Sequence, residues 1–281
     1  MNESTRTRHL RWWLVCAGLL VHGVAAAQTP APQEPYTPTV GQPGKDAVWV
    51  PTSAAMVEKM LDMAKITPRD FVMDLGSGDG RTIIAAARRG VPGLGVEYNP
   101  DLVELSTREA KKLGVGDKAR FVQGDMYAAD ISKASVLALF LLPQNLEKLK
   151  DKFLALPPGS RIVANTFWIP DWSADETETL GENCDNWCTS LLFIVPAKVE
   201  GRWRVDDGKG EVSLTQKYQM LTGTFTPASG QATPVQGRLR GNEITLTVGD
   251  NEYSGRVNGD TMEGSAKTGA DRSVLKATRI R

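Results

Sequence analysis

The sequence has 281 residues, which is enough for one large domain or two modest ones. It carries 33 basic and 33 acidic side chains, so no overall field favours a nucleic acid or an anionic membrane as partner. A hydrophobic content of 41% suits an ordinary globular core.

The N-terminus has the three regions of a secretory signal peptide. Three arginines precede an apolar run over residues 12–24, and Ala25-Ala26-Ala27 offers a small-residue cleavage site. The run is short for a membrane span, so residues 1–27 are predicted to be a signal peptide of a periplasmic or secreted protein. If this signal stays uncleaved, the chain is anchored in the inner membrane. Residues 28–45, rich in Pro, Gln and Gly, are predicted to be a disordered linker.

The histidines and cysteines restrict the possible chemistry. Both histidines, His9 and His22, lie in the predicted signal, so the mature chain lacks the commonest general base and a frequent metal ligand. No metal site is therefore expected, and no catalytic residue can be named. Cys184 and Cys188 remain after export, and we expect them to form a local disulfide in a loop.

A glycine-rich stretch, Asp-Leu-Gly-Ser-Gly-Asp-Gly over residues 74–80, joins an apolar run to a segment with helical character. In a strand–turn–helix unit, backbone N–H groups at the helix start point into a cleft, and glycines let a ligand approach the main chain. We therefore predict a ligand site in this loop. Its candidate residues are Asp74, Gly76, Ser77, Gly78, Asp79 and Gly80.

The loop favours one ligand over another. Its spacing is G-x-G-x-G, whereas the dinucleotide fingerprint is G-x-G-x-x-G. The carboxylates of Asp74 and Asp79 would repel a pyrophosphate. S-adenosylmethionine has a sulfonium and an ammonium group and no phosphate, so the chemistry favours this cofactor over NAD.

Polar side chains also follow the next two predicted strands. Glu97 ends the strand over residues 93–98, where a carboxylate in such folds takes the ribose hydroxyls. Asp125 and Met126 follow the strand over residues 119–123. Asp125 can accept from an adenine amino group, and Met126 can pack on the ring.

Alternating strands and helices predict a doubly wound, mostly parallel α/β sheet of Rossmann-like type. Residues 135–142 form a continuous apolar run typical of a central parallel strand, and residues 161–164 begin a fifth strand. Ligands of such sheets bind outside the carboxyl ends of the strands. The turn after the fourth strand is therefore predicted to line the substrate side, through Leu142, Pro143 and Asn145.

The remaining chain is predicted from its changing periodicity. The acidic segment over residues 168–186 is either a solvated loop or a contact for a basic substrate. Residues 189–195 and 198–205 are predicted to be a closing pair of strands. From residue 207 to residue 281, alternating apolar residues predict an antiparallel β-meander, as a small sheet or an open barrel without a catalytic cluster.

The chain resembles the class I S-adenosylmethionine-dependent methyltransferases in residues 74–80, in Glu97, in residues 124–126 and in Leu-Leu-Pro over residues 141–143. Val-Pro-Thr over residues 50–52 adds a resemblance to the protein-lysine methyltransferases that include the ATP synthase c-subunit enzymes. This resemblance implies methyl transfer from S-adenosylmethionine to an acceptor, with a protein lysine as the expected one. It also implies a methyltransferase domain over residues 46–206, in which Asp74 and the loop glycines hold the methionine end of the cofactor.

Two features depart from that family. Residues 165–168, Asn-Thr-Phe-Trp, do not carry the Ser-His-Asp-Phe-like string expected after the fifth strand, and the cofactor of the family is made in the cytoplasm rather than outside it. A non-catalytic exported binding protein that retains the fold stays open as an alternative, as does a nucleotide-dependent oxidoreductase. No nucleic acid partner and no stable membrane span after signal cleavage are expected.

Overall fold

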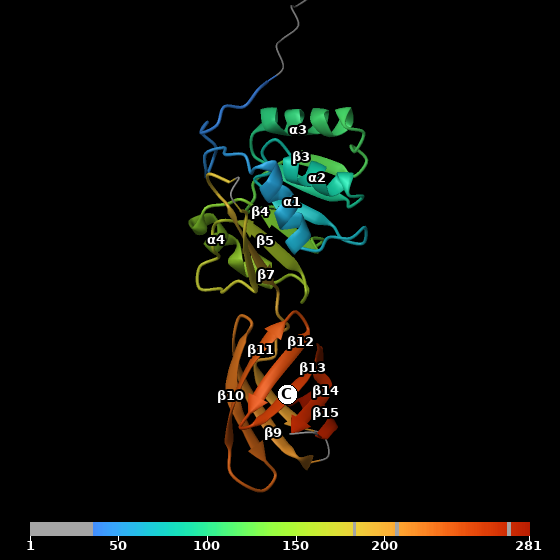
Figure 1. The fold of residues 1–281 in the computed structure, drawn as a ribbon, viewed down its shortest axis with the longest axis vertical. Coiled ribbons are helices and arrows are strands. Elements are labelled where there is room, and N and C mark those ends of the chain that lie inside the picture. The colour runs from blue at the N-terminus through green and yellow to red at the C-terminus, as the bar shows by residue number, and fades with distance from the viewer. Residues whose placement is uncertain (1–35, 182–183, 206–207, 269–270) are drawn as a thin grey trace, which may run out of the picture. The chain divides into compact units, whose positions relative to one another are not determined.

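A computed structural model of the chain describes residues 36–181, 184–205, 208–268 and 271–281. The predicted signal over residues 1–27 and the first part of the predicted linker lie outside these residues. In chain order, the described residues form a mixed sheet with four helices and then a β-barrel (Figure 1). None of the helices in these residues is long and apolar enough to cross a membrane.

The sheet is seven-stranded, with the order β3-β2-β1-β4-β5-β7-β6. Strands β1 to β5 are parallel, whereas β7 is antiparallel to both of its neighbours. The bounds are β1 Val72–Leu75, β2 Gly93–Glu97, β3 Ala119–Gln123, β4 Val136–Leu139, β5 Arg161–Asn165, β6 Glu176–Thr179 and β7 Thr189–Ile194. The strand order reverses between β1 and β4, which is where ligands of such sheets bind. The predicted doubly wound, mostly parallel fold is confirmed.

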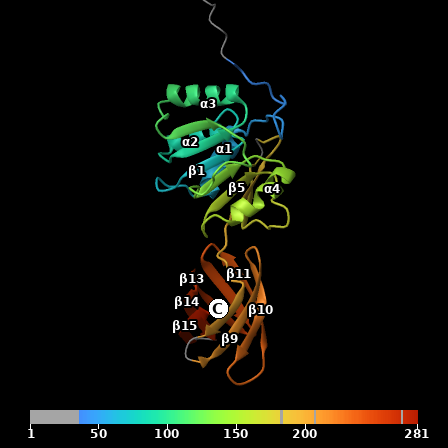
Figure 2. The ribbon, with the colours of Figure 1, turned by 180° about the vertical axis from the view of Figure 1, so that it is seen from behind.

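Helices cover both faces of the sheet because its strands are apolar on both sides. Val72 and Val136 belong to the core that contains α1 and α2, whereas their neighbours Met73 and Leu137 pack with α4. Figures 1 and 2 view the molecule from opposite sides: α1 lies in front of the sheet in Figure 1, and α4 lies in front of it in Figure 2. The helices are α1 Ala54–Met63, α2 Arg81–Arg88, α3 Pro100–Lys112 and α4 Pro143–Leu154.

The acidic segment is neither a plain loop nor a set of free carboxylates. It contains β6, which pairs with β7. Asp175 accepts from Arg238 at 2.8 Å, Glu178 accepts from Lys59 at 2.7 Å, and Glu176 pairs with Arg240. The prediction of a solvated segment is wrong for Asp175, whose side chain is buried, and holds for Glu178, which is exposed. None of the three carboxylates is free for a basic substrate, because each has a partner within the chain. Glu182 lies outside the described residues.

The C-terminal strands form a closed barrel with the order β10-β11-β12-β13-β14-β15-β8-β9. The strands are β8 Gly201–Val205, β9 Gly210–Lys217, β10 Met220–Pro227, β11 Thr233–Arg240, β12 Glu243–Val248, β13 Asn251–Asn258, β14 Thr261–Thr268 and β15 Asp271–Arg279. Their inward side chains, among them Trp203, Val235 and Leu239, form a separate apolar core. The antiparallel meander is confirmed, but it closes on itself instead of staying a small sheet or an open barrel.

Strand β8 corrects the predicted division of the chain. It pairs with β9 and β15 and therefore belongs to the barrel, so the prediction that residues 198–205 close the sheet is wrong. The predicted boundary between residues 206 and 207 falls between two hydrogen-bonded strands of the barrel. The change from sheet to barrel lies instead between β7, which ends at Ile194, and β8.

Candidate active site

A cleft of about 1000 Å³, open to solvent, lies at the carboxyl ends of β1, β2 and β4. Its lining begins at Gln42 and ends at Leu141, so the chain before β5 supplies all of it, through the segment before α1, the strand ends and the helices α1, α2 and α3. Of the nine predicted cofactor residues, eight line this cleft. They are Asp74, Gly76, Ser77, Gly78, Asp79, Glu97, Asp125 and Met126.

A segment that we call the strap, residues 36–52, forms one wall of the cleft. Within it, the backbone N–H of Gly41 donates to the carbonyl of Trp49 at 2.9 Å, and the N–H of Trp49 donates to the carbonyl of Gln42 at 3.0 Å. Arg81 at the start of α2 donates to the Thr52 carbonyl at 2.7 Å and fixes the end of the strap. The predicted disordered linker is therefore ordered over residues 36–45. Residues 28–35 lie outside the described part of the chain.

The amides of the glycine loop bind protein oxygens. The N–H groups of Gly76 and Ser77 donate to the carbonyl of Val96, at 2.8 and 3.1 Å. The N–H of Gly78 donates to Oε2 of Glu97 at 2.8 Å. These three N–H groups lie before the start of α2 and are occupied within the protein. A loop whose amides are already satisfied is no cradle for a pyrophosphate, which needs free backbone donors.

Gly78 and Gly80 have different tasks. Gly78 has φ +55°, and a Cβ there would lie 2.6 Å from Nε1 of Trp49, so only glycine lets the strap close over the loop. Gly80, the ninth predicted residue, does not line the cleft. It has φ +79° at the start of α2, and a Cβ there would lie 2.6 Å from the side chains of Phe121 and Ser106.

The two loop aspartates differ in charge compensation. Asp79 is held by Arg81, whose Nε lies 2.9 Å from its Oδ1, so Asp79 is not the repulsive charge that the sequence suggested. Asp74 is only 6% exposed. Burial raises the pKa of its carboxyl to about 7, opposed by a hydrogen bond with Thr82 and supported by the charges of Glu97 and Asp79. A cationic ligand group would relieve this burial penalty.

Glu97 and Ser77 are further polar residues of the cleft lining. Backbone amides fix the Glu97 carboxylate, because Asn99 donates to Oε1 at 2.9 Å while Gly78 holds Oε2. Each carboxylate oxygen keeps a further lone pair for a hydroxyl donor. Ser77 Oγ is buried and has no hydrogen-bond partner among the described residues. The Ser77 side chain packs against Gly95 of β2, so it lies beneath the loop and does not face a ligand in the cleft.

Asp125 and Met126 follow β3, as expected. The Asp125 carboxylate lies 2.6 Å from Nζ of Lys45 in the strap, and this hydrogen bond holds the pKa of Asp125 below its usual range. Lys45 also lies 5.0 Å from the ring centroid of Tyr98. Met126 is 9% exposed and gives the cleft an apolar floor. The strap side of the site was not predicted, since Lys45 and Trp49 belong to no motif, although a Trp two residues before Pro51 is a signal for local order.

The predicted substrate residues lie beside the cleft and not in its lining. Leu142 caps α4, Pro143 is its first residue, and the side-chain amide of Asn145 donates to the hydroxyl of Tyr127 at 2.8 Å. The preceding residues, Phe140 and Leu141, line the cleft instead. The turn after the fourth strand therefore does line the cleft, but the lining begins at Phe140, two residues before the predicted Leu142.

The chain is similar to known proteins. A family model described as the ANTKMT methyltransferase domain matches residues 74–176. The chain is 40% identical to a protein-lysine N-methyltransferase of Saccharolobus islandicus over 150 residues, which are 52% of this chain and 92% of that protein. It is 33% identical to the lysine N-methyltransferase of the ATP synthase c-subunit from Mus musculus, over 65% of this chain and 72% of that protein. The chain belongs to this family of lysine N-methyltransferases.

The crystal structure of one relative contains the demethylated form of the predicted cofactor. The crystal structure of an RNA methyltransferase from Salinibacter ruber in complex with S-adenosyl-L-homocysteine has a TM-score of 0.50 and 39% identity to this methyltransferase. The match covers 53% of this chain and 96% of that one. This protein is therefore an S-adenosylmethionine-dependent methyltransferase, and the oxidoreductase and non-catalytic alternatives are set aside.

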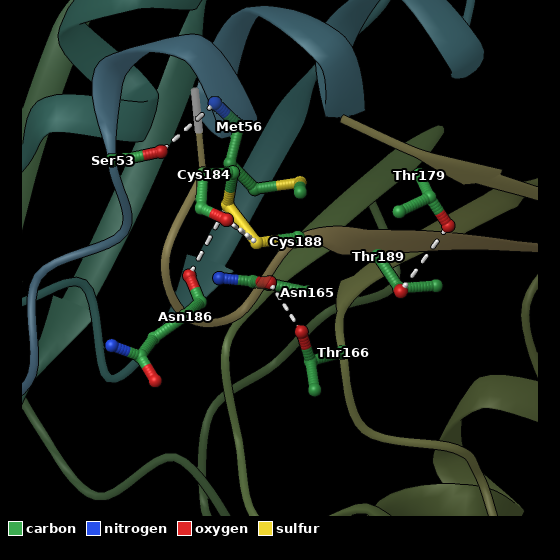
Figure 3. The surroundings of a disulfide bond; sticks show 9 residues. All are labelled: Ser53, Met56, Asn165, Thr166, Thr179, Cys184, Asn186, Cys188 and Thr189. Carbon is green, nitrogen blue, oxygen red and sulfur yellow. Dashed lines mark hydrogen bonds between the residues drawn. A yellow bond between two sulfur atoms is a disulfide. The ribbon is translucent and has the colours of Figure 1, made fainter. Parts of the chain in front are cut away.

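Cys184 and Cys188 of the methyltransferase form the predicted disulfide, with a Cα–Cα distance of 5.7 Å. The bridge lies in a loop, as expected. Figure 3 shows it among residues of the first turn of α1 and of the end of β5. Across the described residues, no group of three His, Cys, Asp or Glu side chains is placed to hold a metal ion.

Reduction of this disulfide is expected to lower the stability of the methyltransferase only modestly, by about 2 kcal/mol, because the loop it closes is short. Urea unfolding with and without a phosphine reductant measures the change. Mass spectrometry after non-reducing alkylation checks the bridge itself. Two alkylated thiols in native protein would contradict it.

Removal of the barrel is expected to leave cofactor binding within about threefold of the full chain, because distant sites act independently. A chain that ends at Lys198 retains every residue of the cleft lining. A chain that ends at Val205 also keeps β8 without its two partners, and we expect it to self-associate through that unpaired edge. Calorimetric titration with S-adenosylhomocysteine and light scattering compare the two. A folded shorter chain that cannot bind would show that the barrel supports the cleft.

Proposed function

We propose that this methyltransferase methylates lysine side chains of a protein. The cleft itself carries the proposal. It offers buried or fixed carboxylates and apolar walls, while the amides of residues 76–78 are occupied. That set suits a ligand with a cationic amino-acid end, hydroxyls and a flat ring, and not a phosphate. The lysine N-methyltransferases to which the chain is 40% and 33% identical support lysine as the acceptor.

The residues of the cleft receive the following roles in this proposal. Asp74 balances the ammonium group of the cofactor, Glu97 accepts from the ribose hydroxyls, and Asp125 and Met126 hold the adenine ring. S-adenosylmethionine supplies, when bound, a methyl group on a sulfonium that is already an excellent leaving group. The protein therefore mainly orients the acceptor for an in-line approach and excludes water. Phe140 and Leu141 form the wall on the acceptor side.

We also propose that the protein works outside the cytoplasm, after cleavage of residues 1–27. The arginines, apolar run and small residues at the N-terminus support this, as does the disulfide, because such bonds persist in oxidising compartments. Edman sequencing of protein from the periplasm is expected to begin at Gln28. Protein found only in the membrane with an intact N-terminus would instead support the anchored form.

The acceptor is tested with radiolabelled S-adenosylmethionine, the purified protein, and separate fractions of envelope protein and total RNA. We expect label in protein, released as methyllysine on acid hydrolysis, and none above background in RNA. The Gly78→Ala variant serves as the inactive control. Label in RNA would overturn the lysine proposal and would place the activity with that of the Salinibacter ruber relative, which is described as an RNA methyltransferase.

A further inference from the structure

Three aromatic rings meet beside the cleft, and we call them the aromatic cluster. Phe140 follows β4, Phe167 follows β5, and Trp187 lies in the disulfide loop between β6 and β7. The ring centroids of Phe140 lie 5.9 Å from Phe167 and 5.6 Å from Trp187, and Phe167 and Trp187 are 5.5 Å apart. Phe140 also lines the cleft. The cluster is therefore continuous with the cleft on the side of β4.

The cluster is open to solvent instead of being part of a core. Trp187 is 42% exposed, and Phe140 and Phe167 are half-buried. Such rings at the rim of a cleft leave apolar surface and aromatic faces for a ligand. A lysine side chain matches both properties, because its methylenes pack on apolar surface and its nitrogen, once it gains positive charge on methylation, is attracted by ring faces. Asp185, exposed in the same loop, adds a negative charge for a basic segment.

Backbone constraints hold two of the three rings in place. Trp187 has φ +61° and precedes Cys188, one half of the disulfide. Thr166, which precedes Phe167, also has φ +61°, and its N–H donates to the carbonyl of Thr189 at 2.7 Å. Figure 3 shows Thr166 and Thr189 among the surroundings of the bridge. Non-glycine residues in this conformation persist only where the surroundings enforce them, and they gather at functional sites.

We propose that the aromatic cluster receives the side chain of the acceptor lysine, and that the Cys184–Cys188 disulfide positions Trp187 for this task. The inference rests on the proposed lysine acceptor and adds the residues that select it. The lysine gives its proton to solvent water and enters as a neutral amine. Its nitrogen lone pair then forms a bond to the methyl carbon, while the carbon–sulfur bond breaks and its electron pair stays on sulfur.

This transfer explains why rings suit the position. Positive charge passes from sulfur to the lysine nitrogen during the reaction, and the methylated ammonium then loses a proton to water or keeps its charge when fully methylated. Aromatic faces stabilise positive charge on nitrogen more than they stabilise the neutral amine. The cluster therefore favours the transition state and the product over the entering lysine, which is what accelerates a reaction.

The test uses the full chain saturated with S-adenosylhomocysteine and titrated with Nα-acetyl-Nε-trimethyllysine amide as the probe. Trp187→Ala is expected to weaken probe binding about tenfold, whereas Trp187→Phe retains most of it. Reduction of the Cys184–Cys188 disulfide with a phosphine is expected to weaken probe binding almost as much as Trp187→Ala does. Trp168→Ala is the matched control, since Trp168 is 51% exposed, adjoins Phe167 in sequence and stacks on no other ring within the described residues.

The outcomes separate this inference from the proposed function. Trp187→Ala and Trp168→Ala should each have the melting temperature of the unsubstituted protein and its affinity for S-adenosylhomocysteine. Equal probe affinities in Trp187→Ala and the unsubstituted protein would overturn the role of the cluster, as would equal losses in Trp187→Ala and Trp168→Ala. Lysine methylation with an unchanged KM for the acceptor in Trp187→Ala would overturn it while leaving the proposed function intact. Label in RNA alone, together with Trp187-dependent binding of the probe, would overturn the proposed function and keep the cluster as an alkylammonium site.

Discussion

Gly78→Ala is expected to weaken binding of S-adenosylhomocysteine about 100-fold, equivalent to about 3 kcal/mol, in a protein that stays folded. The left-handed conformation of residue 78 costs an alanine roughly 1–2 kcal/mol. The added methyl group would also lie 2.6 Å from Nε1 of Trp49, so the strap cannot keep its place over the loop. Calorimetric titration gives the affinity, and circular dichroism checks the fold.

Gly90→Ala is the matched control for that variant. Gly90 follows α2 with φ +83°, but a Cβ there meets nothing within 4 Å. This substitution carries the conformational cost without the contact, so it should lower stability by about 1 kcal/mol and leave cofactor affinity unchanged. A folded Gly78→Ala protein with the affinity of the Gly90→Ala protein would refute the assignment of the loop.

Asp74→Asn is expected to have two opposite effects. It should stabilise the cofactor-free protein at pH 8 by as much as roughly 4 kcal/mol, because the pKa of Asp74 is raised from 3.8 to about 7 by burial. It should also weaken S-adenosylhomocysteine binding at pH 8 about 100-fold, because a neutral amide does not balance the ammonium group. The asparagine oxygen can keep the hydrogen bond with Thr82.

The pH dependence follows from the sign of this shift. Between pH 4 and pH 7 the folded protein holds a proton on Asp74 that the unfolded chain releases, so its stability falls as pH rises through this interval. Urea unfolding should therefore show a difference between Asp74→Asn and the unsubstituted protein that grows from pH 4 to pH 7 and is constant above it. A difference that is the same at every pH would contradict the buried, titrating carboxyl.

Cofactor binding should depend on the same group. Below pH 7, the ammonium group binds the ionised form of Asp74, so binding releases a proton and affinity rises with pH. Titration at pH 6 in buffers of different ionisation enthalpy measures this proton release. The Asp74→Asn variant should lack it, and a release that is unchanged in the variant would assign the proton to another group.

Sequence periodicity predicted the parallel part of the sheet because β1, β2 and β4 are short, apolar and followed by a helix. The run over residues 135–142 is one example, and β4 with the start of α4 confirms it. The same reasoning failed at β8. Its five residues alternate between buried and exposed side chains, and this alternation is the same for a strand at the edge of a sheet as for a strand in a barrel. Its partners, β9 and β15, are decided by tertiary contacts that no local pattern contains.

The sequence also did not predict that the barrel is closed or that the strap is ordered, and the reasons are related. At Gly223, a Cβ would lie only 1.9 Å from the carbonyl oxygen of Ser213, so glycine permits the close strand approach that closure needs. In the sequence, the same glycine indicates a turn or a bulge. The strap is rich in Pro and Gly, a composition typical of disordered segments, and is ordered by distant contacts such as Lys45 with Asp125.

The cofactor site was easier to predict than the acceptor site. Strand ends of a doubly wound sheet share one edge, so Asp74, Glu97 and Asp125 could be brought together from the sequence alone. Trp187 could not, because it comes from a loop whose position depends on a disulfide and on the antiparallel strands β6 and β7. Loop residues of this kind have no periodicity that indicates where they lie.

The pairing of β8 with β15 determines when the barrel can fold during synthesis. Arg279 of β15 is the partner of Trp203 of β8, so the first strand of the barrel is paired on both edges only after the last strand has left the ribosome. At synthesis rates of about 5–20 residues per second, this leaves β8 without that partner for several seconds. The strands of the sheet end at Ile194, so they can pair with one another in that interval. Trp203, which is fully buried in the finished barrel, lacks its β15 partner during this time, so the barrel half of the new chain exposes apolar surface for longer than the sheet half.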